Sequence, residues 1–275
     1  MISGATRVAA VIGDPVRHSL SPILHNTAYR ELGLDWSYVA FEVPDGQTAA
    51  ALQGARALGL VGLSVTMPHK TAAAAACDEL TDDAAALRSV NTATVEDGKL
   101  LGASTDGPGF LRSLADAGCD PTGARVLVVG GGGAARAVAL AFGRAAAHVQ
   151  VAARRPVAAA ETAALAGGEA VEWHDRAAAA IDAAIVVNAT PVGMGDDPAI
   201  VVAVDALHPG QVVADLVYHP LETALLAAAR AAGATPVDGL GMLVHQAVLQ
   251  QEIWTGIRPD PLAMRAAAEA ELARR

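Results

Sequence analysis

The chain has 275 residues and a formal net charge of −10, and it is 53% hydrophobic but only 3% aromatic. A chain of this length predicts two domains. The acidic balance argues against a nucleic-acid partner, which would need a basic face. Because no apolar run approaches roughly 18 residues, we expect no membrane partner. Two cysteines without metal-type spacing, Cys77 and Cys119, favour a cytoplasmic protein with reduced thiols.

Strand-like and helix-like runs alternate in the first part of the chain, which predicts an α/β fold with a largely parallel sheet. Asp97-Gly98 predicts the turn of a hairpin within residues 91–104. A linking helix is expected over residues 105–117. The remaining elements expected here are strands over residues 8–12, 36–43 and 62–66, and helices over residues 22–32, 48–58, 70–77 and 82–88.

A glycine-rich turn, Gly130 to Gly133, follows a strand expected over residues 125–129 and opens an alanine-rich helix. This context predicts a dinucleotide-phosphate site. Gly130 allows the tight turn, Gly132 lets the backbone approach a pyrophosphate, and Ala135 packs the helix on the strand. The helix N-terminus offers unpaired N–H groups to the phosphates. Later elements are expected as strands over residues 148–153, 184–188, 211–217 and 234–237, and helices over residues 243–256 and 261–275.

The second strand of this unit ends in Ala153-Arg154-Arg155, roughly 20 residues after the glycines. An acidic residue there would bind the 2′-hydroxyl of NAD. Two arginines instead suit a 2′-phosphate through charge-assisted contacts. Ordinary surface charges at a strand end are the alternative, but the position behind the glycine turn favours NADP as the cofactor.

Polar side chains outside this turn form the first two candidate clusters. Ser19 and Ser21 stand two apart beside a helix N-terminus, so their hydroxyls can share one side and bind a carboxylate. A serine before proline is also an ordinary N-cap. Thr66 ends a buried strand, and Lys70 then begins a helix. A lysine there is unfavourable to the helix dipole, which invites a functional interpretation beside that of a solvated lysine.

A third cluster brackets the predicted hairpin. Asn91 precedes its first strand and Asp106 follows its second, so both side chains can face one cleft, although each could simply cap a turn. The histidines share no spacing typical of a metal site, and we expect no metal.

Eight motifs, taken in order, resemble the shikimate dehydrogenase family over nearly the whole chain. The resemblance implies an N-terminal α/β substrate domain, a Rossmann NADP-binding domain and C-terminal helices that return to the first domain. The expected boundaries are residues 1–105 with 241–275, and residues 106–240. The motifs are His18-Ser19-Leu20-Ser21-Pro22, Val65-Thr66-Met67-Pro68-His69-Lys70, Val90-Asn91-Thr92, Ser104-Thr105-Asp106-Gly107, the glycine turn with Arg136, Asn188-Ala189-Thr190-Pro191-Val192-Gly193-Met194, Asp215-Leu216-Val217-Tyr218-His219-Pro220-Leu221-Glu222-Thr223, and Asp238-Gly239-Leu240-Gly241-Met242-Leu243-Val244-His245-Gln246-Ala247.

The resemblance implies a reversible reduction of 3-dehydroshikimate to shikimate by NADPH in aromatic amino-acid (chorismate) biosynthesis. Lys70 and Asp106 would be the catalytic pair, with Lys70 acting as a proton shuttle or as an electrostatic clamp. The residues implied for the substrate are Ser19, Ser21 and Tyr218 at its carboxylate and Thr66, Lys70, Asn91, Asp106 and Gln246 at its hydroxyls and ring. Those implied for the cofactor are Gly130, Gly131, Gly132, Gly133, Ala134, Ala135, Arg154, Arg155, Thr190, Leu216 and Gly239.

The sequence departs from the family at three positions where asparagine is usual: Ser64, Ser104 and Ala153. We expect the two serines to brace backbone turns, and Ala153 to lie in the cofactor pocket.

Three other functions stay open, and a fourth is excluded. A quinate/shikimate dehydrogenase, using NAD in some cases, often replaces the second serine, which is retained here as Ser21. An aminoshikimate dehydrogenase would carry nearly the same clusters. The excluded function is that of a two-domain folate dehydrogenase, because such an enzyme would lack the serine pair and the Tyr218 segment, both of which are present here. A non-catalytic NADP(H) sensor would be expected to lose its reactive groups, whereas Lys70 and Asp106 are present. The expected partner is the small-molecule substrate, and a homodimer stays open.

Overall fold

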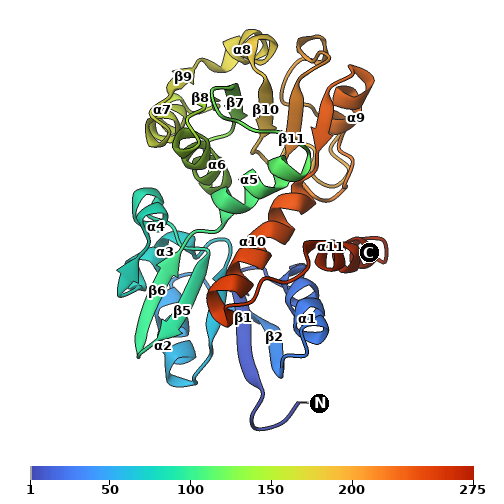
Figure 1. Cartoon of the computed structure of the whole chain (residues 1–275). Coiled ribbons are helices and arrows are strands. Elements are labelled where there is room, and N and C mark those ends of the chain that lie inside the picture. The colour runs from blue at the N-terminus through green and yellow to red at the C-terminus, as the bar shows by residue number, and fades with distance from the viewer. Residues whose placement is uncertain (1) are drawn as a thin grey trace. The chain divides into compact units, whose positions relative to one another are not determined.

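The structure is a computed structural model that describes residues 2–275. The chain forms two compact units (Figure 1). The N-terminal unit comprises residues 1–105 and 246–275, and the central unit comprises residues 106–245. No helix within residues 2–275 is long and apolar enough to cross a membrane.

The N-terminal unit is built on a six-stranded sheet with the order β2-β1-β3-β5-β6-β4. The first three strands of this order are parallel, whereas β5 pairs antiparallel with β3 and with β6. The predicted hairpin supplies both antiparallel pairs, and the other three of the five strand pairs, including β4 with β6, are parallel as expected. Both turn residues, Asp97 and Gly98, have positive φ, which confirms the predicted turn. The strands are β1 (Arg7–Gly13), β2 (Trp36–Glu42), β3 (Gly62–Val65), β4 (Glu79–Leu80), β5 (Thr92–Glu96) and β6 (Lys99–Ala103).

The helices of this unit begin at sequence signals that can be identified individually. Pro22 lies in the first turn of α1, where its missing N–H costs no helix bond. Asp260 caps α11 by accepting a hydrogen bond from the Leu262 N–H over 2.9 Å. Within the sheet, Ala9 and Ala10 of β1 are fully buried. The helices are α1 (Ser21–Glu31), α2 (Thr48–Ala57), α3 (Lys70–Ala76), α4 (Asp82–Leu87), α11 (Pro261–Leu272) and the larger part of α10 (Gly239–Thr255).

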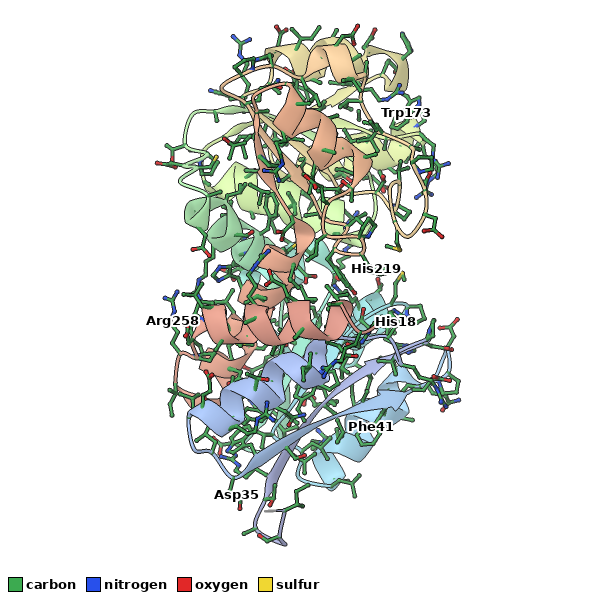
Figure 2. All side chains as sticks on the ribbon, turned by 90° about the vertical axis from the view of Figure 1, so that its right-hand side faces the viewer. His18, Asp35, Phe41, Trp173, His219 and Arg258 are labelled. Atoms are coloured by element: carbon green, nitrogen blue, oxygen red, sulfur yellow. The ribbon has the colours of Figure 1, made fainter. Side chains whose placement is uncertain are left out.

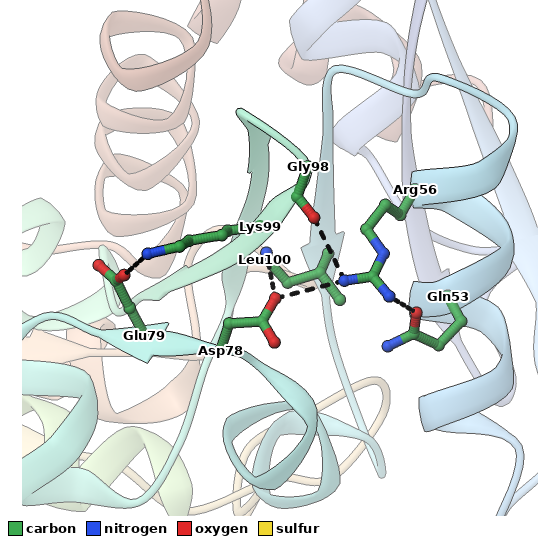
Figure 3. A network of polar contacts seen from close by, with 7 residues as sticks. All are labelled: Gln53, Arg56, Asp78, Glu79, Gly98, Lys99 and Leu100. Carbon is green, nitrogen blue, oxygen red and sulfur yellow. Dashed lines mark hydrogen bonds and ion pairs between the residues drawn. The ribbon is translucent and has the colours of Figure 1, made fainter.

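A polar network ties the β5–β6 hairpin to α2 (Figure 3). The Asp78 carboxylate accepts hydrogen bonds from the Leu100 N–H over 2.8 Å and from Arg56 over 3.4 Å. Arg56 also donates to the Gly98 carbonyl over 3.2 Å. The hairpin whose two ends carry Asn91 and Thr105 is thus fixed at its far end.

The central unit has a six-stranded sheet, entirely parallel, with the order β12-β11-β10-β7-β8-β9. Read from its first strand, β7, this is the Rossmann order, which confirms the predicted cofactor fold. Its strands are β7 (Arg125–Val129), β8 (His148–Ala152), β9 (Glu169–Val171), β10 (Ile185–Asn188), β11 (Val212–Asp215) and β12 (Thr235–Val237). Its helices are α5 (Asp106–Asp116), α6 (Gly133–Arg144), α7 (Pro156–Leu165), α8 (Arg176–Asp182) and α9 (Ala224–Ala231), with 3₁₀ turns η1 (Trp173–Asp175) and η2 (Val204–Ala206).

Every strand expected from the sequence is present. The differences are helices α7, α8 and α9, for which no range was expected, two short strands, and the helix ends. Strands β4 and β9 were not expected, because two or three residues show no alternation of polar and apolar side chains. Helix α10 begins at Gly239 rather than near residue 243. The Asp238 side chain accepts a hydrogen bond from the Gly241 N–H over 3.2 Å, which stabilises this earlier first turn.

Candidate functional site

Ser19 and Ser21 lie at the loop that enters α1. The Ser21 N–H donates to Ser19 Oγ over 3.2 Å. The N-cap of the helix is Leu20, without a side-chain hydrogen bond, so neither serine is the ordinary N-cap that the sequence allowed. Arg275 holds the loop by donating to the carbonyl of His18 over 2.7 Å. Ser19 Oγ thus accepts the first N–H of α1, and the Ser21 hydroxyl is hydrogen-bonded to Tyr38.

Thr66 and Lys70 follow β3 on a tightly packed turn. A Cβ at Gly13 would meet Thr66 Cγ2 at 2.5 Å, so only glycine lets β1 approach this turn. Lys70 is the first residue of α3, and its carbonyl accepts a hydrogen bond from the Val90 N–H over 3.0 Å. The turn thereby joins Lys70 to the residue that precedes Asn91.

His69 braces this turn, a role that sequence reasoning missed. Its ring is buried, and its Nε2 donates to the Val43 carbonyl over 2.8 Å. Its Nδ1 is hydrogen-bonded to Thr48 Oγ1, also over 2.8 Å. The position beside Lys70 was visible in the sequence, but the partners come from other elements.

Asn91 and Gln246 are brought together although they are 155 residues apart in sequence. Both are buried, and Asn91 Nδ2 lies 3.4 Å from Gln246 Oε1. Asn91 Oδ1 accepts a hydrogen bond from the Thr105 N–H over 2.8 Å, which closes the base of the hairpin. Two amides that the resemblance assigned to the substrate therefore lie side by side.

The glycine turn of the central unit has the predicted geometry. Gly130 has a φ of 137°, and a Cβ there would lie 2.7 Å from the Ala189 carbonyl oxygen. Ala135 is fully buried where α6 packs on the sheet. A Cβ at Gly132 or Gly133 would meet no atom within 4 Å. The turn is thus packed on its inner side and open at the residues expected to approach a pyrophosphate, which fits a dinucleotide.

A cavity of about 670 Å³ lies beside this turn, and its wall includes Thr190 and the two arginines expected to select NADP. Arg154 and Arg155 are exposed, and within residues 2–275 neither guanidinium forms an ion pair. Both remain available to an anionic ligand, which fits a 2′-phosphate. Sequence reasoning missed two other wall residues, Trp173 (Figure 2) and Asp197.

Trp173 and Asp197 are each held by local contacts. The Arg176 guanidinium lies 4.2 Å from the centre of the Trp173 ring. Hydrogen bonds from the Gly193 and Ala199 N–H groups lower the pKa of Asp197, which therefore carries its negative charge at neutral pH. No spacing in the sequence links either residue to the glycine turn.

Asn188 and Asp215 brace the carboxyl ends of β10 and β11. Asn188 Nδ2 donates to Asp215 Oδ1 over 2.9 Å, and Thr223 donates to the other carboxylate oxygen over 2.7 Å. Burial raises the pKa of Asp215, while these hydrogen bonds oppose that rise. Asn188 Oδ1 also accepts a hydrogen bond from the Thr190 hydroxyl over 2.7 Å. The brace thus positions Thr190 in the cavity wall.

Leu216 and Gly239 are also close to each other. The Leu216 N–H donates to the Asn188 carbonyl over 2.9 Å. A Cβ at Gly239 would clash with the Leu216 carbonyl oxygen, so the start of α10 approaches the end of β11 only because residue 239 is glycine.

Asp106 and Tyr218 complete the predicted set. Asp106 is buried and begins α5, which packs so closely on α6 that a Cβ at Gly107 would lie 2.6 Å from the Ala137 carbonyl oxygen. Tyr218 follows β11 and is half-buried. Their roles toward a ligand stay predictions. Across residues 2–275, no three His, Cys, Asp or Glu side chains cluster in a way that could hold a metal ion.

Ser64 corrects one expectation. It was expected to brace a backbone turn, but it lies within β3 and its hydroxyl donates to Gln250 Oε1 over 2.6 Å. The side chain faces a helix that lies far away in sequence, and no local pattern reports that partner.

Three family models match successive parts of the chain. Residues 11–93 match the shikimate dehydrogenase substrate binding domain. Residues 118–232 match a putative NAD(P)-binding domain, and residues 239–269 match the shikimate 5′-dehydrogenase C-terminal domain.

Individual proteins agree with these models. The shikimate dehydrogenase (NADP(+)) of Methanopyrus kandleri is 45% identical over 279 aligned residues, which cover 97% of this chain and 96% of its own. A shikimate 5-dehydrogenase from Thermus thermophilus, solved with NADP(H) and shikimate, is 39% identical with a TM-score of 0.89, and the match covers 96% of this chain and 99% of that chain. A quinate dehydrogenase from Corynebacterium glutamicum, solved with NAD, is 32% identical with a TM-score of 0.91. That match covers 96% of this chain and 99% of the quinate dehydrogenase chain. On its sequence, its two folded units and these relatives, the chain belongs to the shikimate dehydrogenase family.

Proposed function

We propose that this chain catalyses the reversible, NADP-dependent interconversion of shikimate and 3-dehydroshikimate. The observation that carries the proposal is the pair Asn91 and Gln246, two buried amides 3.4 Å apart in the unit that also holds Ser19, Ser21 and Thr66. Such a set offers hydrogen bonds to a ligand with several hydroxyls and one carboxylate. Relatives named for this activity are 42–47% identical over nearly the whole chain.

The two units take separate tasks in this proposal. Residues 1–105 and 241–275 supply most of the substrate contacts, and residues 106–240 bind NADP and also supply Asp106 and Tyr218 to the substrate. Ser19, Ser21 and Tyr218 hold the substrate carboxylate, while Thr66, Asn91 and Gln246 contact its hydroxyls and ring. This division is supported by the polar side chains of the N-terminal unit and by the Rossmann strand order of the central unit.

Carbonyl reduction needs a hydride on carbon and a proton on oxygen. Bound NADPH supplies the hydride. Lys70 carries a mobile ammonium group that either donates the proton to the carbonyl oxygen or holds the developing negative charge there. Asp106 is the second member of the catalytic pair, and its carboxyl group contacts the substrate together with Lys70. In the direction of shikimate oxidation, the same residues accept the hydroxyl proton or stabilise the alkoxide.

NADP is the cofactor that the central unit fits. Gly130 to Gly133, Ala134 and Ala135 place the turn and the first residues of α6 at the pyrophosphate. Arg154 and Arg155, in the wall of the adjoining cavity, supply the positive charge for the 2′-phosphate. Thr190, Leu216 and Gly239 lie at the carboxyl edge of the sheet, where a dinucleotide crosses this fold.

Quinate oxidation with NAD is the second candidate, and the likeness to a quinate dehydrogenase solved with NAD favours it. A single crossed assay decides between the two. Shikimate and quinate are each combined with NADP⁺ and NAD⁺, and the absorbance of the reduced nicotinamide is followed. We expect the highest kcat/KM with shikimate and NADP⁺. Turnover of quinate with NAD⁺ alone would replace the proposal with the second candidate, and no turnover in any combination would reject both.

The cellular location of the protein and its assembly with a second copy of itself are also proposals. Burial raises the pKa of the Cys77 thiol to about 11, which leaves an unreactive thiol and is compatible with a reducing cytoplasm. A homodimer is the assembly to test, by light scattering of the purified protein.

A further inference from the structure

A hydrogen-bond network in the interior of the N-terminal unit is centred on Gln250, a fully buried residue of α10. Its Oε1 accepts hydrogen bonds from Ser64 Oγ over 2.6 Å and from His25 Nε2 over 3.2 Å. Its Nε2 donates to Thr92 Oγ1 over 2.9 Å and to the Asn91 carbonyl over 3.3 Å. Both ends of the amide are therefore fully used.

The donors on the oxygen side allow only one orientation of this amide. Gln251 Nε2 lies 3.2 Å from His25 Nδ1, so Nδ1 is the acceptor of the ring and Nε2 carries the hydrogen. Burial keeps the ring neutral by lowering the pKa of His25 to about 3. A flipped Gln250 amide would turn its N–H groups toward this N–H donor, which is unfavourable.

The Nε2 side of the Gln250 amide, through Thr92, fixes the orientation of the Asn91 amide. The Thr92 hydroxyl receives a hydrogen bond from Gln250, so its own proton is directed to Asn91 Oδ1, which lies 2.8 Å away. The same Oδ1 accepts the Thr105 N–H over 2.8 Å. With two donors facing Oδ1, the Asn91 amide is held with its Nδ2 toward Thr105 Oγ1, 2.9 Å away, and Gln246 Oε1, 3.4 Å away.

We propose that Gln250 is a positioning residue that, through Thr92, sets the orientation of the Asn91 amide, so that Asn91 meets a hydroxyl-bearing ligand as an N–H donor. This inference rests on the proposed function, because that function places Asn91 at the substrate. Gln250 itself is buried behind Asn91 and acts only through its neighbours.

The same glutamine also reaches the other end of the predicted substrate site. Ser64, which donates to Gln250, accepts a hydrogen bond from the Tyr38 hydroxyl. The Tyr38 hydroxyl is in turn hydrogen-bonded to Ser21. One buried amide thus links a residue predicted for the substrate carboxylate with one predicted for a ring hydroxyl, whereas the NADP site lies in the central unit.

The test compares Gln250→Met with Gln251→Met. Each variant replaces a fully buried amide of α10 by an apolar side chain of similar length and removes a partner of His25, but only Gln250 contacts Thr92 and Asn91. We expect Gln250→Met to lower kcat/KM for shikimate about 3- to 10-fold, the effect of one hydrogen bond. The KM for NADP⁺ should stay within about twofold in both variants. Equal losses of kcat/KM in both, or no loss in folded Gln250→Met, would overturn the proposal.

Thr92 supplies a second pair of variants if Gln250→Met is poorly folded. Thr92→Val removes the relaying hydroxyl at nearly constant volume, and Thr92→Ser restores it. The loss in kcat/KM for shikimate should appear in the valine variant and be largely reversed in the serine variant. A similar loss of kcat/KM in both variants would mean that the Thr92 hydroxyl does not orient the Asn91 amide, and would reject the proposed link from Gln250 through Thr92 to Asn91.

A readout without turnover separates this proposal from the proposed function. The side-chain amide signals of Asn91, assigned by their absence in Asn91→Asp, are followed by two-dimensional NMR of the full chain. They should shift in Gln250→Met and in Thr92→Val and stay in place in Gln251→Met. If the wild-type chain fails to oxidise shikimate while these shifts are seen, the proposed function fails and the positioning role stands. Unshifted signals in folded Gln250→Met would reject the positioning role whatever the activity.

Discussion

The imidazole of His25 stacks on the phenol ring of Tyr38, with ring centres 4.2 Å apart and planes inclined by 6°. The contact buries His25 completely between α1 and β2. Because an imidazolium would lose its hydration there, burial lowers the pKa of His25 to about 3. The ring is neutral in the folded protein over the whole range in which an unfolded histidine becomes charged.

His25 should therefore make the folded protein less stable as the pH falls. The folded pKa lies below the unfolded value of about 6.5, so the unfolded chain takes up a proton first, and the stabilisation present above pH 6.5 is lost progressively down to about pH 3. Between pH 7 and pH 5 this group alone should cost about 2 kcal/mol of the free energy of unfolding. His25→Phe, which keeps the stacked ring, should be less stable at pH 7 but lose about 2 kcal/mol less on acidification, as measured by urea unfolding.

The control for this prediction is His148→Phe, at the exposed start of β8. It should lose as much stability on acidification as the wild type. An unchanged pH dependence in His25→Phe would show that the buried ring is not the group responsible.

Gly132 should be tolerated by the fold but needed by the cofactor. A methyl group there meets no atom within 4 Å, and the residue has a φ of −90°. Gly132→Ala should therefore leave the melting temperature nearly unchanged, yet the methyl group would stand where a pyrophosphate approaches. We expect the Kd for NADP⁺, measured by calorimetry, to rise about tenfold, which corresponds to about 1.4 kcal/mol.

Gly54→Ala is the matched control, because it also adds a methyl group in open space, but in α2 of the N-terminal unit. Its Kd for NADP⁺ should equal that of the wild type. Wild-type affinity in Gly132→Ala would mean that the cofactor does not cross the turn at this residue.

Arg154 and Arg155 should determine the preference for NADP over NAD. A charge-assisted hydrogen bond contributes about 1.5–3 kcal/mol, so Arg154→Ala or Arg155→Ala should raise the KM for NADP⁺ about 10- to 150-fold. The KM for NAD⁺, which lacks the 2′-phosphate, should change little. Steady-state kinetics with both cofactors measure the ratio.

Arg125→Ala is the control, since Arg125 is exposed and begins β7 at the end of the strand opposite to the glycine turn. It should leave the ratio unaltered. Equal losses with both cofactors in the Arg154 and Arg155 variants would argue for a general electrostatic effect rather than recognition of the phosphate.

Lys70 should be required for the chemical step. Lys70→Met removes the ammonium group while keeping the length of the side chain, and the loss of a positioned acid should lower kcat about 100-fold or more. The chain has only one other lysine, Lys99, which is exposed and paired with Glu79 (Figure 3). Lys99→Met is therefore a control with the same chemical change.

The kinetic pattern decides which role Lys70 has. A fall in kcat with an unchanged KM for shikimate indicates a group that acts in the transition state. A raised KM with wild-type kcat would make Lys70 a binding residue and remove it from the reaction.

The sequence predicted most about the parts of the site that are built from residues close together in the chain. The glycine turn is such a case, since Gly130 to Ala135 form a continuous segment whose conformation follows from the absence of Cβ atoms. The position of Asn91 before the hairpin indicated that residue and the family resemblance added Gln246, but no local pattern indicated that their side chains touch. Ser64 was interpreted wrongly because its partner, Gln250, lies 186 residues further along the chain.

By itself the sequence determined the α/β class, the Rossmann unit and the family, because alternating strands and helices and the tight turns depend on residues close together in the chain. The tertiary structure alone decided which buried polar groups face each other. His69 with Thr48, Asn188 with Asp215, and Gln250 with Thr92 are joined across separate elements. A buried donor or acceptor must find a partner wherever folding places one, and that choice is made in space rather than along the chain.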